Sequence, residues 1–366
     1  MKTSAESSVA SARTGGARTA SEFMAGALNP SPLAAGIALV LTVVVCALAL
    51  VLVNPDAIAG ASRTRLASHA EDYDAVATAS VLAFARAPRP AAVLVVLGGS
   101  TTRASLLEED LQRVVGDKVP DGVVLKLCTS RQSLWDSIVL AEQLPRQLSG
   151  YAVIGVGPSL FSMGAVLTDL AEQPRLGVRS EMFDQAQVAK GGRPRARTGI
   201  FVLDNAPFLL ARRKQLTQAA LGRPAPAYVD SVYQAERSTV SPRGWQTRAT
   251  RVAERYPAVD KNWAGNAALL ARLIGMLEAA GLDVVLVETP VNPRFVRERD
   301  GAGIGVAHVE RMRAFASQRG VPYVVMNEAA RLDESDFFDW AHIRTREAAR
   351  RCAEALRPYL WRSRIS

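Results

Sequence analysis

From residue 91 onward, short apolar runs alternate with amphipathic stretches. Five runs rich in β-branched residues have the length of buried parallel strands, at 91–97, 123–127, 151–156, 283–287 and 321–326. Other stretches repeat apolar residues at intervals of three and four, as helices do, at 133–144, 160–170, 266–280 and 306–318. This alternation predicts an α/β domain whose parallel sheet is covered by helices on both faces, with a ligand site at the carboxyl ends of the strands.

Ahead of this domain lies an uncharged run of 21 residues, 33–53. As a helix it would be about 31 Å long, which matches the roughly 30 Å hydrocarbon core of a bilayer. The sequence therefore favours one transmembrane helix. The alternative is a cleaved signal peptide, because Ala57-Ile58-Ala59 resembles a cleavage site, although the apolar part of a signal peptide is usually shorter.

Basic residues near the apolar run do not orient it. Arg13 and Arg18 precede the run, and Arg63 and Arg65 follow it, so the two sides are equal. Residues 1–32, rich in Ser, Ala, Gly and Thr, predict a disordered tail. Residues 54–90 predict a juxtamembrane linker that includes a helix, and 91–366 form the main domain.

One segment of the main domain, 174–261, lacks the strand and helix pattern apart from a helix expected near 206–220. It contains sixteen basic and seven acidic residues, so its net charge equals the +9 of the whole chain. We expect this basic insertion to lie above the strand ends and to contact an anionic partner such as lipid headgroups or an acidic polymer. The alternative is a solvated loop that reflects the Arg-rich composition of the chain.

The first candidate for chemistry follows the first predicted strand, where the chain has Gly98-Gly99-Ser100-Thr101-Thr102. A serine at this place exposes its hydroxyl at the end of the sheet. Its amide would lie near the start of the next helix, where a developing oxyanion is stabilised. The same residues would also serve as an ordinary helix N-cap.

The second candidate is Asp339 with His342, in a loop before a helical pattern at 345–356. Their spacing allows the carboxylate to orient the imidazole toward a serine. His69 lies close to the apolar run, and His308 lies in a predicted helix whose nearest acidic residue points to another face. His342 is therefore the natural base, although a buried histidine beside a helix-capping aspartate is the structural alternative.

Together, the GGSTTR block and the late DWAH block resemble the SGNH/GDSL hydrolase superfamily, whose members take a serine from the first block and Asp-x-x-His from the last. The resemblance extends over about 91–359, and it implies a flavodoxin-like, three-layer α/β/α fold. It also implies that Ser100 is the nucleophile, His342 the base and Asp339 its orienting partner. The apolar helix, the central insertion and Thr289-Pro290-Val291-Asn292-Pro293 are similar to the membrane-anchored DltD/AlgJ/AlgX branch.

The chain departs from the superfamily pattern at its oxyanion donors. The second-block glycine is replaced around 128–131, where a backbone amide could still donate. The third block, usually Gly-x-Asn-Asp, is Gly155-Val156-Gly157-Pro158, so the side-chain amide donor is missing. Loss of one such donor typically costs about 10² to 10³ in rate. Arg103 and Arg131, near predicted strand ends, are candidates for holding an anionic group of the substrate.

The resemblance implies a single-pass protein of the bacterial inner membrane with an extracytoplasmic domain. Through an acyl-serine, that domain would transfer or remove O-acyl groups on a polysaccharide or other envelope polymer, alongside a membrane-bound O-acyltransferase. The alternative is a non-catalytic polymer-binding or assembly subunit of an exopolysaccharide system. The sequence does not separate esterase from transferase.

Several other classes lack their signatures. There is no Gly-x-Ser-x-Gly elbow, no His and Cys spacing typical of zinc, and no nucleic-acid recognition module. The glycines at 301–305 do not follow a strand, as a dinucleotide fingerprint would require. We therefore expect no metal, no cofactor and no nucleic acid. Cys128 and Cys352 would form a disulfide outside the cytoplasm or remain buried thiols, and the second alternative is favoured.

Overall fold

The computed structural model describes residues 31–52, 73–167, 170, 175–176, 178–193, 198, 204–205, 240–300 and 303–361. The chain divides into two units, Met1–Leu52 and Val53–Ser366. Most of the tail predicted at 1–32, much of the predicted linker and the helix expected near 206–220 lie outside the described residues.

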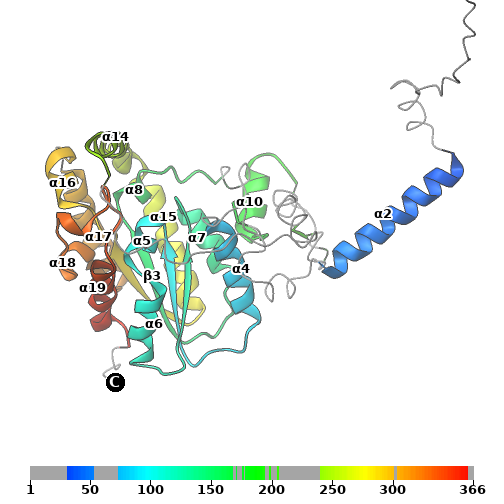
Figure 1. Ribbon diagram of the computed structural model, residues 1–366, viewed down its shortest axis with the longest axis horizontal. Helices are drawn as coiled ribbons and strands as arrows, with labels where there is room; N and C mark the ends of the chain where they lie inside the picture. The colour runs from blue at the N-terminus through cyan, green and yellow to red at the C-terminus, as the bar shows by residue number, and fades with distance from the viewer. Residues whose placement is uncertain are drawn as a thin grey trace, which may run out of the picture. The chain divides into compact units, whose positions relative to one another are not determined.

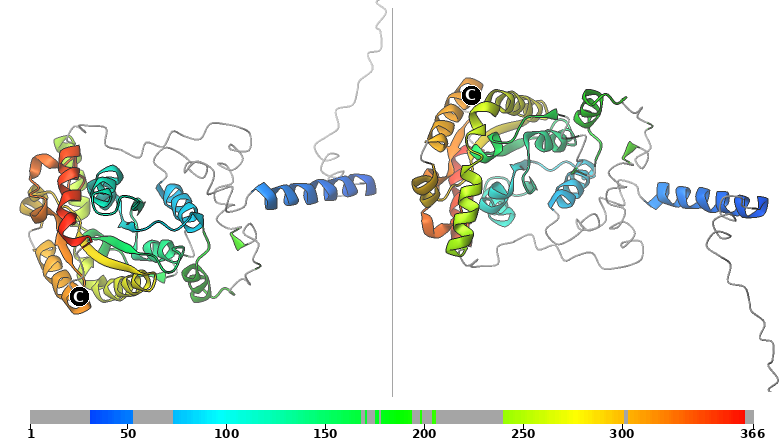
Figure 2. Two further views of the ribbon diagram at one scale, coloured as in Figure 1. Left: turned by 90° about the horizontal axis from the view of Figure 1, so that it is seen from below. Right: turned by 90° about the horizontal axis from the view of Figure 1, so that it is seen from above.

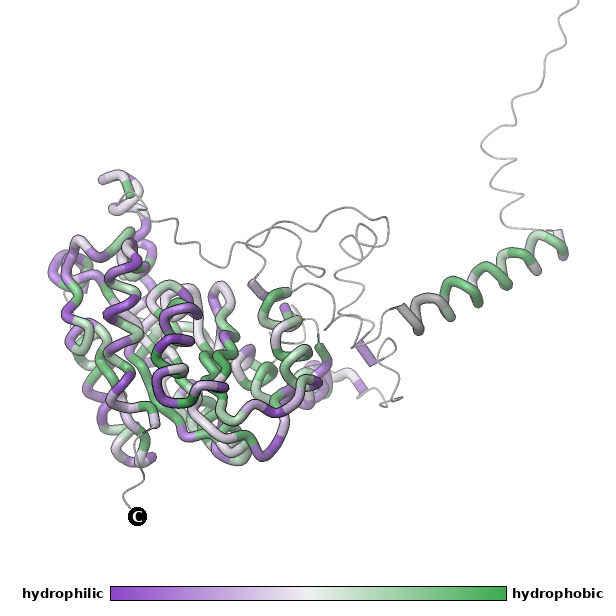
Figure 3. Tube along the Cα trace, turned by 60° about the horizontal axis from the view of Figure 1, so that its bottom comes forward, coloured by the Kyte–Doolittle hydropathy of each residue, from purple (hydrophilic) through white to green (hydrophobic). Residues whose placement is uncertain are grey.

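The described part of the first unit is a single helix, α2 (Pro32–Leu52). Its bounds agree within one residue with the apolar run, and Figure 3 shows its apolar character along most of its length. In the described part of the chain, however, no helix is long and apolar enough to cross a membrane. The transmembrane helix expected at 33–53 is thus not found there.

The second unit is built on a parallel sheet of five strands in the order β2-β1-β3-β4-β5. The strands are listed with their bounds: β1 (Val93–Gly98), β2 (Val123–Cys128), β3 (Gly150–Val156), β4 (Leu282–Glu288) and β5 (Tyr323–Val325). Each corresponds to a predicted run. The strand order is that of flavodoxin-like doubly wound sheets, in which ligands bind where the order reverses, between β1 and β3.

Helices cover both faces of the sheet (Figures 1 and 2). One apolar core contains side chains of α4 (Tyr73–Arg86), α7 (Leu134–Ala141), α15 (Ala258–Ala279) and α17 (Ile304–Arg319). The other contains side chains of α6 (Glu108–Gly116) and α19 (Arg346–Leu356). Alternate residues of each strand enter the two cores, which is consistent with the predicted three-layer α/β/α architecture.

The helix predicted at 160–170 is interrupted. Helix α8 (Pro158–Phe161) ends at its start, residues 162–166 are not helical, and Leu167 and Leu170 are helical again. The side-chain amide of Asn266 donates to the carbonyl oxygens of Phe161, at 3.2 Å, and Met163, at 2.9 Å. Because these carbonyls are satisfied from α15, the chain ends the helix there and turns.

The basic insertion is more regular than its composition indicated, because it contains α10 (Glu181–Ala189) and α14 (Pro242–Ala253). The sequence pattern indicated neither of these two helices. Ser180 and Ser241 cap these helices, since each hydroxyl accepts a backbone amide of the first turn. Helix α14 packs against α16 (Pro293–Arg299), as Figure 1 shows.

The remaining elements in the described part of the chain are short helices: α5 (Ser100–Ser105), α18 (Met326–Ala329), η1 (Glu334–Asp336) and η2 (Arg357–Tyr359). Cys128 and Cys352 are buried thiols that form no disulfide with each other, so the disulfide alternative is not found.

Candidate active site

Ser100, His342 and Asp339 meet at the carboxyl end of the sheet. Nε2 of His342 lies 2.9 Å from Oγ of Ser100, and Nδ1 lies 2.9 Å from Oδ1 of Asp339. An ionised carboxylate only accepts hydrogen bonds, so the neutral imidazole carries its proton on Nδ1 and leaves Nε2 free to accept the serine proton. The structure therefore brings together the three residues that the two sequence blocks indicated.

Ser100 is the first residue of α5, directly after β1. The turn before it passes close to the neighbouring strand, which two glycines permit. A Cβ at Gly98 would lie 2.3 Å from Oγ1 of Thr102, and a Cβ at Gly155 would lie 1.9 Å from the same oxygen. The helix after β1 thus begins at the serine itself.

The loop of Asp339 and His342 is held from several sides. Phe337 and Ile343 form an antiparallel bridge that closes the loop. The side-chain amide of Asn292 donates to the carbonyl oxygen of Asp339 at 3.1 Å, and the Asn292 amide donates to the carbonyl of Trp340 at 2.8 Å. The loop therefore presents the imidazole in a defined orientation, with α16 as its support.

Asp339 is buried, with 2% of its surface exposed. Burial alone would raise the pKa of its carboxyl, but hydrogen bonds from His342 and from the amides of Ala341 and His342, together with the charge interaction with His342, outweigh burial. The pKa of Asp339 therefore lies well below its usual range. Arg248 of α14 also donates to Oδ2 of Asp339, at 2.8 Å. The carboxylate thus stays ionised at neutral pH.

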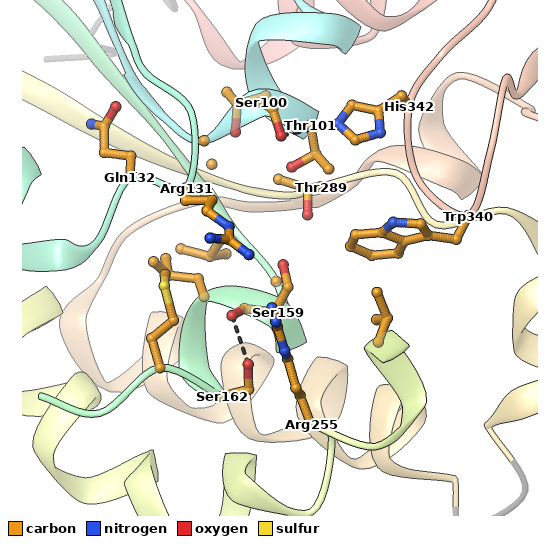
Figure 4. Close-up of a pocket in the computed structure, with 18 of the residues that line it drawn as sticks. Ser100, Thr101, Arg131, Gln132, Ser159, Ser162, Arg255, Thr289, Trp340 and His342 are labelled. Carbon is orange, nitrogen blue, oxygen red and sulfur yellow. Dashed lines mark hydrogen bonds between the residues drawn. The ribbon is translucent and has the colours of Figure 1, made fainter. Parts of the chain in front are cut away.

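These side chains open onto a cavity of about 700 Å³ (Figure 4). Its walls come from the ends of β1 and β3, from the loop after β4, from α8 and α14, and from the Trp340 loop. Hydroxyl groups of Thr101, Ser159 and Thr289 and the indole of Trp340 line it. An ester of moderate size would fit beside Ser100.

Arg131, one of the two arginines singled out from the sequence, lines this cavity and extends into it in Figure 4. Arg103 does not line it. Its guanidinium lies 3.4 Å from the centre of the Tyr73 ring and contacts Ser130 at 3.4 Å, so this side chain binds α4 instead. Arg103 thus lies outside the wall of this cavity, and its contact with the substrate stays a prediction.

Three arginines of the cavity wall were not identified from the sequence: Arg248, Arg251 and Arg255. Arg248 lies in the middle of α14, Arg251 in its last turn and Arg255 just after it, all within the basic insertion that the sequence placed above the strand ends. A helical spacing of three and four residues was present in the sequence, but the abundance of Arg in the surrounding segment obscured it.

The backbone amides expected near 128–131 as donors to the oxyanion are only partly available. The amide of Thr129 donates to Oε1 of Gln132 at 2.8 Å and to the carbonyl of Gly98 at 3.2 Å, so it is committed within the protein. At the third block, Gly157 carries no side chain. A Cβ there would lie 2.4 Å from Oγ1 of Thr289, so the threonine hydroxyl occupies the space where a longer side chain would begin.

His308 takes no part in this site. It is fully buried against Phe161 and Trp263, with its Nε2 at 3.4 Å from Oε2 of Glu288. The hydroxyl of Tyr323 donates to the same carboxylate oxygen at 2.6 Å. In the described residues, no group of three or more His, Cys, Asp or Glu side chains is placed to hold a metal ion.

No family model and no curated protein matches this chain. The assignment of chemistry to the site therefore depends on its residues and their geometry.

Proposed function

We propose that the protein is a serine-dependent acyltransferase or esterase that forms an acyl-serine at Ser100. The observation that carries the proposal is the continuous series of hydrogen bonds from Ser100 through His342 to the buried carboxylate of Asp339. A serine hydroxyl is a weak nucleophile unless a positioned base removes its proton, and this arrangement supplies that base.

In the proposed reaction, Oγ of Ser100 attacks the carbonyl carbon of an ester while Nε2 of His342 takes the hydroxyl proton. The tetrahedral intermediate collapses to the acyl-serine, and the imidazolium returns the proton to the departing alcohol. A second alcohol or water then attacks the acyl-serine, with His342 again taking and returning a proton. Asp339 stabilises the imidazolium in both halves of the reaction.

The substrate class follows from the resemblance to the SGNH/GDSL superfamily and its DltD/AlgJ/AlgX-like branch. We infer that the acyl group is O-linked to an extracytoplasmic polysaccharide or other envelope polymer, with a membrane-bound O-acyltransferase as a partner. The uncharged run at 33–53, which forms a helix whose described side chains are exposed, supports attachment to the inner membrane. Reporter fusions after Ser366 would test the proposed topology.

Acylation of Ser100 is tested by mass spectrometry of the intact protein after exposure to 4-nitrophenyl acetate, with peptide mapping of the adduct. The parent should gain one acetyl group on Ser100, and Ser100→Ala should gain none. Ser130→Ala is the matched control, because Ser130 is exposed and does not line the cavity. A Ser100→Ala protein that is labelled as well as the parent would exclude Ser100 as the nucleophile.

One observation favours a second function. Gly157 supplies no side-chain donor to the oxyanion, so the domain could bind an acylated polymer without turning it over. A parent protein that binds the polymer but forms no adduct with any activated ester would support this binding or assembly function instead.

A further inference from the structure

We propose that the cavity beside Ser100 selects esters that carry a negative charge, and that the arginines of α14 and of the turn after it, together with Arg131, recognise that charge. This inference rests on the proposed function and specifies its substrate class. It is carried by the positions and partners of the arginines that line the cavity.

The first observation is that three of these arginines lie on one face of α14 and of the turn after it. Arg248, Arg251 and Arg255 follow one another at intervals of three and four residues, which places them in one stripe along α14 and the turn that continues it. Arg131 approaches from the opposite wall, and in Figure 4 it and Arg255 extend into the same space. Four guanidinium groups therefore line one cavity.

The second observation is the shortage of carboxylates near them. Asp339 is the only acidic residue among the described residues that line the cavity, and it pairs with Arg248. Within the described residues, no ion pair forms at Arg131, Arg251 or Arg255. Many arginines elsewhere in the described residues are paired, as in Arg294–Glu298, Arg311–Asp260 and Arg357–Asp117.

Clustered guanidinium groups without counter-charges repel one another and create a positive potential in the cavity. A carboxylate or phosphate group of a ligand would relieve that repulsion and accept charge-assisted hydrogen bonds. The hydroxyls of Ser159 and Ser162 and the indole of Trp340 also line the cavity and offer the polar and aromatic contacts that a sugar ligand uses. The chemistry thus fits an anionic glycan ester.

The charge could belong to the alcohol part of the ester or to the acyl group. Two pairs of probes separate these sources. 4-Acetoxybenzoate and its methyl ester differ in charge on the alcohol part, and 4-nitrophenyl hemisuccinate and 4-nitrophenyl acetate differ in charge on the acyl part. The full chain is assayed for kcat/KM with each probe at low and high salt.

The expected result is a preference for the charged member of at least one pair, and that pair identifies the source. The preference should fall by about tenfold in Arg251→Gln/Arg255→Gln and should weaken in high salt. Arg319→Gln, on an exposed position of α17 outside the cavity, should retain it. No preference in either pair, or a preference unchanged by the double substitution, would overturn the inference.

Failure of the proposed function would be seen separately, as absence of acylation with all four probes. The selectivity for anions would then be measured by binding to Ser100→Ala. Polygalacturonate should bind more tightly than neutral dextran, and the double arginine substitution should remove the difference. Equal binding of the two polymers would overturn the inference in that case.

A second, independent inference concerns Thr289. We infer that its hydroxyl donates to the oxyanion in place of the side-chain amide that is missing at Gly157, so that Thr289 is a catalytic residue of the proposed reaction. The Thr289 amide donates to the carbonyl of Val156 at 2.7 Å, which fixes the residue beside the end of β3. Its hydroxyl occupies the space above Gly157 and faces the cavity (Figure 4).

The hydroxyl is also uncommitted. Within the described residues it neither donates nor accepts a hydrogen bond, although only 7% of the residue is exposed. A buried hydroxyl on the cavity wall can donate to a charge that develops there without first losing another partner. During acylation that charge develops on the carbonyl oxygen of the ester as Ser100, which lines the same cavity, attacks it.

Thr289→Val keeps the shape of the side chain and removes the donor. In the variant, kcat for 4-nitrophenyl acetate should fall by about a hundredfold while KM changes little, because the interaction forms only in the transition state. Thr289→Ser should recover most of the rate. Equal rates for the parent and Thr289→Val would overturn this role, and so would a rate lost equally in the valine and serine variants.

Discussion

Arg248 and Asp339 form an ion pair at the back of the candidate triad, although they are 91 residues apart in the sequence. Nη1 of Arg248 lies 2.8 Å from Oδ2 of Asp339, while Oδ1 accepts from the amides of Ala341 and His342 and lies 2.9 Å from the imidazole. Every acceptor direction of the carboxylate is thus used. The pair also connects the basic insertion to the loop of Asp339 and His342.

The first prediction concerns this pair. Arg248→Met should lower kcat/KM for 4-nitrophenyl acetate by about threefold to tenfold, because the carboxylate loses one of several donors but keeps its bonds to His342. Arg243→Met is the matched control, since Arg243 is an exposed arginine of the same helix that does not line the cavity. An equal loss in the two variants would mean that α14 acts through its fold and not through this contact.

The second prediction concerns the triad of Ser100, His342 and Asp339. Ser100→Ala and His342→Ala should each reduce acylation by about a thousandfold or more, and the double variant should lose little beyond either single one, because the two groups act as a unit. Asp339→Ala should lose less, since the carboxylate orients the imidazole without itself attacking. Additive losses in the double variant would contradict the proposed mechanism. Burst kinetics would measure the acylation rate of each variant. Far-ultraviolet circular dichroism of the same samples would show whether the variant is still folded.

The parts of the site that sequence predicted are those carried by local pattern. The apolar run before Gly98 identified β1 and hence the exposed position of Ser100, and the spacing of Asp339 and His342 identified the base. Each signal lies within a few residues of the chain. The strand ends then bring the two blocks together because the sheet is parallel.

The parts that sequence did not predict depend on packing between distant segments. Arg248 and Arg251 look like any other arginine of a segment rich in that residue, and only the docking of α14 against α16 turns them toward the cavity. Arg103 lies one turn after the serine, but the aromatic ring of Tyr73 holds it elsewhere. The role inferred for Thr289 depends on its proximity to Gly157, which no local pattern encodes.

The third prediction follows from the low pKa of Asp339. Its carboxyl has a lower pKa in the folded chain than the value of about 3.9 expected in the unfolded chain, so its ionisation stabilises the fold at neutral pH. This stabilisation is fully present above the unfolded pKa and is lost as the pH falls below it toward the folded pKa. Asp339→Asn should therefore have a lower free energy of unfolding than the parent, and this difference should be larger at pH 7 than at pH 3.

Urea unfolding of the two proteins at a series of pH values measures this difference. Ser130→Ala serves as the control, because this exposed serine does not titrate in this range and contacts neither Asp339 nor His342, so its effect on the free energy of unfolding should not depend on pH. The difference in the free energy of unfolding between Asp339→Asn and the parent could instead be constant from pH 3 to pH 7. That result would show that the hydrogen bonds of the folded state do not stabilise the ionised carboxylate.

The last prediction concerns the close approach of β3 to the serine turn. In Gly155→Ala the new Cβ would lie 1.9 Å from Oγ1 and 2.8 Å from Cβ of Thr102, so α5 must shift or Thr102 must move. The free energy of unfolding should fall by about 1 to 3 kcal/mol. Acylation should fall more than stability alone explains, because Ser100 begins the displaced helix. Thr102→Ala in the same protein should restore part of the stability by removing the nearest atom.

Gly275→Ala is the matched control: Gly275 lies within α15 with no atom within 4 Å of the added Cβ, so the substitution should be neutral or stabilising by up to about 1 kcal/mol. Thermal unfolding and adduct formation measured on the same samples would check both effects. A Gly155→Ala protein as stable and as reactive as the parent would show that the strand and the serine turn are not held as closely as the structure places them.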